Sequence, residues 1–179
     1  MARYAVLLRG INVGGNKKIA MAELRTLLEK LGFTDVKTLL QSGNAVVTSK
    51  LTAAKVAAAC EKGIEDEFGM KVRCLVLSGP QLHAIIDAHP LAAVADNGSR
   101  MFALFLFDKL DAAKLSTHDP AALDPGNVVV GDGVVYHWCP NGVLESVDVG
   151  AYLNKNHKVT VTSRNWNTVT KLAALVDAG

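Results

Sequence analysis

Two polar stretches near the start of the chain hold residue types that suit an anion. The first, RGINVGGNKK (residues 9–18), has three cations and three glycines. The second, QSGN (residues 41–44), offers two side-chain amides and a hydroxyl. Main-chain N–H groups at glycines approach a ligand closely, and a helix that follows the loop adds its positive N-terminal end. The chemistry indicated is the binding of phosphate or a related anion.

The first stretch differs from well-known phosphate-binding loops. It has no GxGxxG pattern, and the pattern GxxxxGK[ST] fits from Gly10 to Gly15 but meets Asn16 where lysine is required. The loop is therefore neither a dinucleotide-binding fingerprint nor a Walker A loop. A long turn solvated by its polar residues is the alternative interpretation.

A third stretch, TSRNWNTVTKL (residues 162–172), carries another cation at the start of a predicted helix. Arg164 is not needed to cap that helix, so it is a candidate for the second half of an anion site. A solvated basic face is the alternative, since residues 154–171 carry four cations and no acid. Trp166 is expected to anchor the helix on the core. The candidate capping residues are Ser163, Asn165 and Asn167.

Hydrophobic periodicity predicts the elements that position these stretches. The order strand, helix, strand, strand, helix, strand is predicted for residues 3–10, 21–31, 35–41, 44–49, 52–68 and 71–77. A connecting helix, strand, short helix, hairpin, weak helix, strand and final helix are predicted for residues 79–89, 100–107, 111–117, 127–138, 144–154, 158–163 and 167–177.

This order predicts an α+β fold of two ferredoxin-like βαββαβ units in tandem, with a C-terminal helix. The first unit is expected at residues 1–78 and the second at 79–179, with the boundary within 78–99. In such a sheet the first two strands run the same way with the third between them. Their carboxyl ends therefore meet at one edge, which brings the 9–18 loop to the 41–44 turn.

The expected ligand-binding residues combine charge, close backbone approach and hydrogen bonding. They are Arg9, Asn12, Gly14, Gly15, Lys17, Gln41, Ser42, Asn44, Arg164 and Asn165.

Composition narrows the class of protein. The chain has 179 residues and a formal net charge of +2, too balanced for a protein whose whole surface binds nucleic acid. No apolar run is long enough to span a membrane. The odd number of cysteines and the lack of CxxC spacing favour buried free thiols in a cytoplasmic protein. No cofactor is expected, and because no histidine pair has ligand spacing, no metal is expected either.

The stretches LLRGINVGGNKK, MAELRTLLEKLGFTDVKTLLQSGN and TSRNWNTVTKL resemble a bacterial family of uncharacterised proteins, domain of unknown function 1697. The resemblance covers nearly the whole chain and is most distinctive over the first 45 residues. It implies an α+β fold and no established activity. The matching signature residues are Arg9, Gly10, Asn12, Gly14, Gly15, Gln41, Ser42, Gly43, Asn44, Arg164, Asn165 and Trp166.

The three stretches offer donors for an anion but no general base, because residues 9–18, 41–44 and 164–167 contain no carboxylate. We therefore expect a protein that binds a nucleotide, a phosphorylated metabolite or a nucleic-acid backbone.

Base recognition on the sheet face is disfavoured, since Tyr4 is the only aromatic residue in the first and third strands. One alternative is a structural or assembly module. Another is an enzyme acting on a phosphorylated substrate with a carboxylate from Asp108, Asp111 or Asp148.

Overall fold

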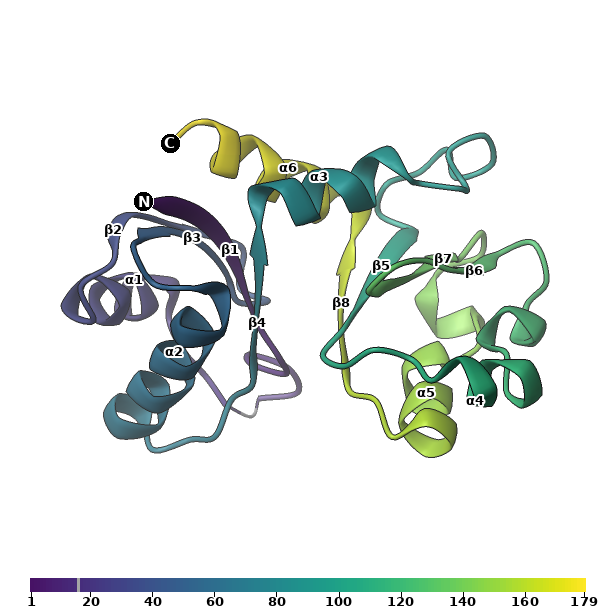
Figure 1. The fold of residues 1–179 in the computed structure, drawn as a ribbon, viewed down its shortest axis with the longest axis horizontal. Helices are drawn as coiled ribbons and strands as arrows, with labels where there is room; N and C mark the ends of the chain where they lie inside the picture. Colours follow the sequence, from purple (N-terminus) through teal and green to yellow (C-terminus); the bar gives the residue numbers. More distant parts are fainter. Residues whose placement is uncertain (16) are drawn as a thin grey trace. The chain divides into compact units, whose positions relative to one another are not determined.

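The computed structural model describes residues 1–15 and 17–179 (Figure 1). Within these residues the chain forms two four-stranded antiparallel sheets with strand orders β2-β3-β1-β4 and β6-β7-β5-β8. In each sheet the first and third strands of the unit are central, which is the ferredoxin-like arrangement. The predicted α+β fold of tandem ferredoxin-like units with a C-terminal helix is confirmed.

The first sheet and its helices follow the predicted order. The elements are β1 (Ala2–Leu8), α1 (Met21–Lys30), β2 (Thr34–Leu39), β3 (Asn44–Ser49), α2 (Ala53–Phe68) and β4 (Cys74–Ser78). Helix α2 shows why its bounds were predictable. The Thr52 side chain accepts a hydrogen bond from the N–H of Lys55 at its start, and Gly69 ends it with a left-handed φ of 68°.

Like the first sheet, the second sheet has two central strands and two edge strands. The remaining α-helices and strands are α3 (Gly79–Asp87), β5 (Met101–Leu106), α4 (Ala112–Thr117), β6 (Val128–Val130), β7 (Val134–Trp138), α5 (Val149–His157), β8 (Val161–Asn165) and α6 (Trp166–Asp177). Short 3-10 turns, η1 and η2, cover Pro120–Leu123 and Val143–Glu145.

Two predicted elements in this half have the wrong bounds. Helix α5 begins at Val149 rather than at residue 144, because Asp148 accepts a hydrogen bond from the N–H of Ala151 and so caps the helix. Strand β8 begins at Val161 and includes Arg164 and Asn165, because its pairing with β5 extends to Phe102.

The contacts within the chain divide it into two compact units. The first unit comprises residues 1–83 and 171–179, and the second comprises residues 84–170. The division at residues 83 and 84 falls inside α3. The last residues belong to the first unit, where the guanidinium of Arg3 donates to the carbonyl of Leu175 at 3.1 Å.

Each unit has its own hydrophobic core. In the first unit, alternate side chains of β1 pack against α1 and α2, and Val6, Leu8, Leu24 and Ile64 are all 0% exposed. In the second unit, the core includes Leu104, Val135, Val149 and Leu153. Burying these apolar surfaces stabilises the sheets that position the loops.

The three cysteines are free and buried, as predicted. Burial raises the pKa of the Cys60 thiol to about 12 and also raises the pKa of Cys74 and of Cys139. These thiols are therefore protonated at neutral pH and are poor nucleophiles.

None of the helices in residues 1–15 and 17–179 combines the length and the apolar character that crossing a bilayer requires.

Candidate functional site

The 9–18 loop and the 41–44 turn lie together at one edge of the first sheet, as the element order predicts. The N–H of Leu8, the last residue of β1, donates to the carbonyl of Gly43 at 2.9 Å. The side-chain amide of Asn12 donates to the carbonyls of Gln41 at 2.7 Å and Ile19 at 2.9 Å. Its oxygen accepts from the N–H of Ile19 at 2.9 Å. The side chain of Asn12 thus joins two parts of the loop by hydrogen bonds and also joins the loop to the turn.

The backbone of both segments is held in left-handed conformations. The N–H of Asn12 donates to the carbonyl of Lys17 at 3.1 Å and closes the loop, while Asn16 lies outside the described residues. Among the described residues, five that are not glycine have positive φ, and three of them, Asn12, Lys17 and Leu40, lie in the loop or next to the turn. Such conformations cost about 1–3 kcal/mol each and gather where a protein needs a particular surface.

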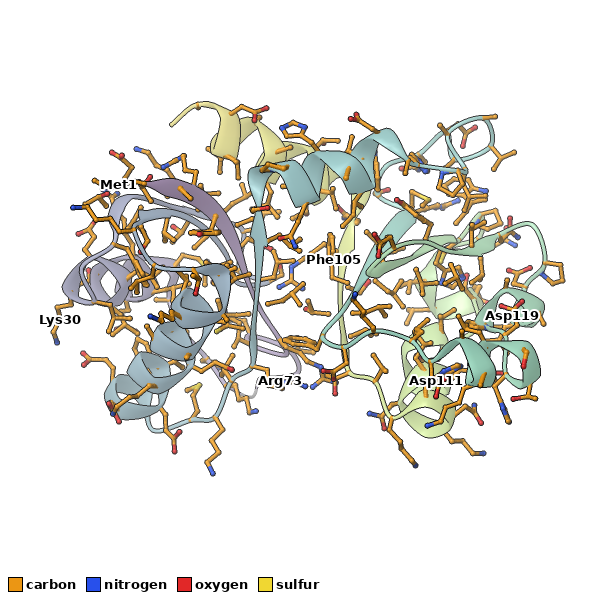
Figure 2. The ribbon with its side chains drawn as sticks, viewed as in Figure 1. Met1, Lys30, Arg73, Phe105, Asp111 and Asp119 are labelled. Atoms are coloured by element: carbon orange, nitrogen blue, oxygen red, sulfur yellow. The ribbon has the colours of Figure 1, made fainter. Side chains whose placement is uncertain are left out.

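A third segment, residues 71–73, joins the same edge, which is not predicted from the sequence. Strand β4 begins at Cys74, which pairs with Leu8, so the residues before β4 lie beside the loop that follows β1. The N–H of Arg9 donates to the carbonyl of Arg73 at 2.9 Å, and Lys17 Nζ donates to the carbonyl of Lys71 at 2.8 Å. Figure 2 shows Arg73 at the start of β4, away from Met1 at the other end of β1.

These segments together form a basic surface, which we call the basic edge. It consists of the exposed side chains of Arg9, Lys17, Lys18, Lys71 and Arg73. No aspartate or glutamate occurs in residues 9–20, 39–45 or 69–78. All the charged side chains of these three segments are therefore positive, although the whole chain has a net charge of only +2.

The predicted residues of the loop and turn differ in what they offer a ligand. Gly14 and Gly15 are exposed, with open space where a side chain would project. Gln41 and Ser42 are also exposed. Asn44 is fully buried, and its amide donates to the carbonyl of Leu39 at 2.9 Å and to Ser42 Oγ at 2.8 Å.

These contacts separate two roles within the predicted set. The amides of Asn12 and Asn44 are bonded to protein atoms and shape the loop and the turn. The exposed cations, glycines and polar side chains form the solvent-accessible surface of the two segments.

The start of α1 adds less attraction for an anion than its place after the loop suggests. Ala20 occupies the N-cap and makes no side-chain hydrogen bond to the helix. Glu23, in the first turn, already complements the positive end of the helix dipole.

Arg164 and Asn165 lie in β8 of the second unit. Arg164 is buried, and its Nη1 donates to Thr162 Oγ1 at 2.9 Å and to the carbonyl of Ser163 at 2.8 Å. Burial lowers the pKa of Arg164 to about 10. Asn165 Oδ1 accepts from the N–H and the hydroxyl of Thr168 at 3.0 and 3.1 Å, so Asn165 caps α6, as one of the three predicted candidates.

Trp166 packs among rings of the second unit. Its ring centroid lies 4.3 Å from that of His89 and 6.3 Å from that of Tyr136. The Tyr136 hydroxyl in turn donates to the carbonyl of Ile85 at 2.6 Å. The prediction that Trp166 anchors the final helix is confirmed.

Two of the three carboxylates considered for catalysis, Asp111 and Asp148, have structural partners. Asp111 Oδ1 accepts from the N–H of Ala113 at 2.8 Å and caps α4. Asp148 does the same for α5, with Ala151 at 2.9 Å. Across the described part of the chain, no three histidine, cysteine, aspartate or glutamate side chains gather as metal ligands would.

Comparison with known proteins places the chain among proteins without an assigned activity. The profile of a family described as "Protein of unknown function (DUF1697)" matches residues 1–136. Among solved structures, the conserved bacterial protein SP0830 from Streptococcus pneumoniae is similar, with a TM-score of 0.74 and 27% identity over 98% of each chain. No curated protein is similar enough to count as a match.

Proposed function

We propose that this chain, which belongs to the DUF1697 family of proteins of unknown function, binds a phosphorylated or otherwise anionic ligand at the basic edge. The observation that carries the proposal is the grouping of five exposed cations from segments whose main chains are bonded together, with no carboxylate in those segments. Like charges placed side by side repel one another, so an arrangement of this kind is best explained by an anion that binds there.

The backbone supports the same proposal. The left-handed residues Asn12 and Lys17 hold the loop in a shape that costs stability, and functional sites commonly carry such a cost. Gly14 and Gly15 leave open space in which main-chain N–H groups can meet a ligand oxygen.

Within this proposal the ligand contacts come from the exposed residues of the first unit. Arg9, Lys17, Lys18, Lys71 and Arg73 supply charge, and Gln41 and Ser42 supply hydrogen bonds. We also propose a cytoplasmic location, because all three cysteines are free thiols. An enzymatic role is less favoured, since Asp111 and Asp148 serve as helix caps.

The test is a thermal-shift titration with inorganic phosphate, nucleotides, sugar phosphates and short oligonucleotides. A ligand at 100 times its Kd stabilises the protein by about 2.7 kcal/mol. For a chain of this length the expected rise in Tm is about 5–10 °C. The double variant Lys18→Glu/Lys71→Glu should lose this rise.

A matched control is available at the other end of the same sheet. Lys50 and Lys55 are exposed and follow β3 at the end where Ser49 pairs with Ala2. The variant Lys50→Glu/Lys55→Glu changes the net charge by the same amount and should keep the full shift. Equal loss in both variants, or no shift with any anion, would refute the proposal and favour a purely structural role for the loops.

A further inference from the structure

We infer that the anion bound at the basic edge is a chain of phosphodiesters, the backbone of a nucleic acid bound without regard to base sequence. The inference rests on the proposed function and names the ligand class for the same site. Three features of the first unit carry it: the exposure of the cations, the residue types around them and the burial of the sheet.

The first feature is the exposure of all five cationic side chains. An ion pair at an exposed position contributes only about 0–1 kcal/mol, so one phosphate group touching one or two of these side chains is held weakly. A chain of phosphates meets several cations at once and releases condensed counterions, which adds a gain that a single phosphate does not provide. An open cluster of cations therefore suits a polyanion better than a small metabolite.

The second feature is the set of residue types around the cations. Residues 9–20, 39–45 and 69–78 contain no phenylalanine, tyrosine or tryptophan. Proteins that hold single-stranded bases stack them on such rings, whereas contacts to phosphate oxygens carry no sequence information. The basic edge accordingly binds the backbone of a nucleic acid and leaves the bases unread.

The third feature is the burial of the sheet itself. Ala5, Leu7 and Val46 on the central strands each have 0% exposure. A sheet face that stacks bases has to be open to solvent, as in ferredoxin-like RNA-binding modules. These central strands therefore offer no stacking platform, and the loops at the edge carry the contact.

The spacing along the chain also fits an extended ligand. Arg9 and Lys17 both belong to the 9–18 loop, and each is bonded to the 71–73 segment at a different residue, Arg73 and Lys71. The cations are thus distributed over two neighbouring segments of the chain, which a ligand with several phosphates can contact together.

The experiment is a fluorescence-anisotropy titration of the full chain at several sodium chloride concentrations. The probes are labelled oligothymidine and oligodeoxyadenosine of equal length, with unlabelled thymidine monophosphate and inorganic polyphosphate as competitors. For single strands, the affinity falls with salt by a slope of about 0.7 per phosphate contacted on logarithmic axes. Contacts from three to five cations predict a slope of about 2–3.5.

Alanine variants locate the contacts. Lys18→Ala and Lys71→Ala should each weaken binding of both oligonucleotides alike and lower the salt slope by about 0.7. Lys50→Ala, at the other end of the sheet, should change neither quantity. The monophosphate should compete at least about a hundred times more weakly than an oligonucleotide, since it meets fewer cations.

Each other result has a definite meaning. Equal affinity for the monophosphate and the oligonucleotide would overturn this inference while supporting a small-ligand version of the proposed function. Tighter binding of polyphosphate with the same slope would assign the site to inorganic phosphate chains and overturn the nucleic-acid assignment. A strong preference for one base would overturn sequence-independent binding. No binding of any phosphate compound would overturn both this inference and the proposed function.

Discussion

The main-chain N–H of Arg9 donates to the carbonyl of Arg73 at 2.9 Å, which sets two arginines beside each other at one edge of a sheet. The bond extends the pairing of β1 with β4 one residue beyond Leu8 and Cys74. Because Lys17 and Lys71 are joined nearby, the fold concentrates positive charge at the place where three polar segments meet.

This concentration of like charge should cost stability. Replacing Lys18 or Lys71 by glutamine should raise the free energy of unfolding by up to about 0.5 kcal/mol at low salt, because repulsion among the remaining cations is relieved. Urea unfolding at low and high sodium chloride measures the effect. The gain should disappear at high salt, where exposed charges are screened. A loss of stability at low salt would mean that these side chains serve the fold.

Asn12 should be important for stability rather than for ligand contact. Its side chain makes three hydrogen bonds within the loop and to the turn, so Asn12→Ala should lower the free energy of unfolding by about 2–3 kcal/mol. Urea unfolding measures this change. Gln41→Ala is the control, since Asn12 bonds the main-chain carbonyl of Gln41 and that bond is retained. A change of less than about 0.5 kcal/mol for Asn12→Ala would contradict the role in positioning.

Two glycines of the site should respond differently to alanine. At Gly43, with φ of +89°, a Cβ would lie 2.6 Å from Ile11 Cδ1 and 3.0 Å from Leu8 Cβ. At Gly14, with φ of +59°, a Cβ meets nothing within 4 Å. Gly14→Ala should cost about 1 kcal/mol for the left-handed backbone alone. Gly43→Ala should cost about 2 kcal/mol more, because the loop must move off the turn. Equal costs, read from thermal unfolding, would show that the loop and the turn are not in close contact.

Buried histidine in the second unit predicts a dependence of stability on pH. His137 is 4% exposed, and its Nε2 has no hydrogen-bond partner among the described residues. Burial lowers the pKa of His137, and the smaller effect of the Asp124 charge acts in the opposite direction. Below about pH 6.5 the unfolded chain binds a proton that the folded chain does not. The free energy of unfolding should therefore fall as the pH drops from about 6.5 towards the lowered pKa.

The variant His137→Gln separates the contribution of His137 to the pH dependence from the contributions of other groups. One of these groups is His89, because burial lowers its pKa as well. Its stability relative to the wild type should improve as the pH falls from about 7 to about 5. Urea titrations across that interval give the difference. A constant difference would show that His137 takes up its proton as readily in the folded chain as in the unfolded chain.

Much of the fold could be predicted from local signals. Strand β3 and helix α2 match their predicted ranges to within a residue, because glycine and asparagine mark the turn before β3 and the apolar residues of α2 follow a helical period. Local patterns did not give the bounds of β8, since the predicted strand ends at residue 163 and Arg164 lies between that strand and the predicted helix. The pairing of Ala103 with Arg164 extends the strand there, and that register arises from tertiary contacts.

The candidate site was predictable to a similar degree. The meeting of the 9–18 loop with the 41–44 turn followed from element order alone. Lys71 and Arg73 were missed because they lie far from the loop in sequence and reach it through the pairing of Leu8 with Cys74. In the sequence, these two cations alternate with the apolar Val72, which is buried in the structure. That alternation is the signal that indicates a polar surface at this edge. The buried amide of Asn44 could not be told from an exposed one by residue type.

The most direct test of the basic edge is to map its ligand contacts residue by residue. Two-dimensional ¹H–¹⁵N NMR spectra of the labelled protein would be recorded during titration with an oligothymidine. The account predicts that the amide signals of residues 9–15, 41–43 and 71–73 shift in proportion to binding, while those of Lys50 and Lys55 stay in place. Shifts confined to other parts of the chain, or none at concentrations where anisotropy reports binding, would contradict it.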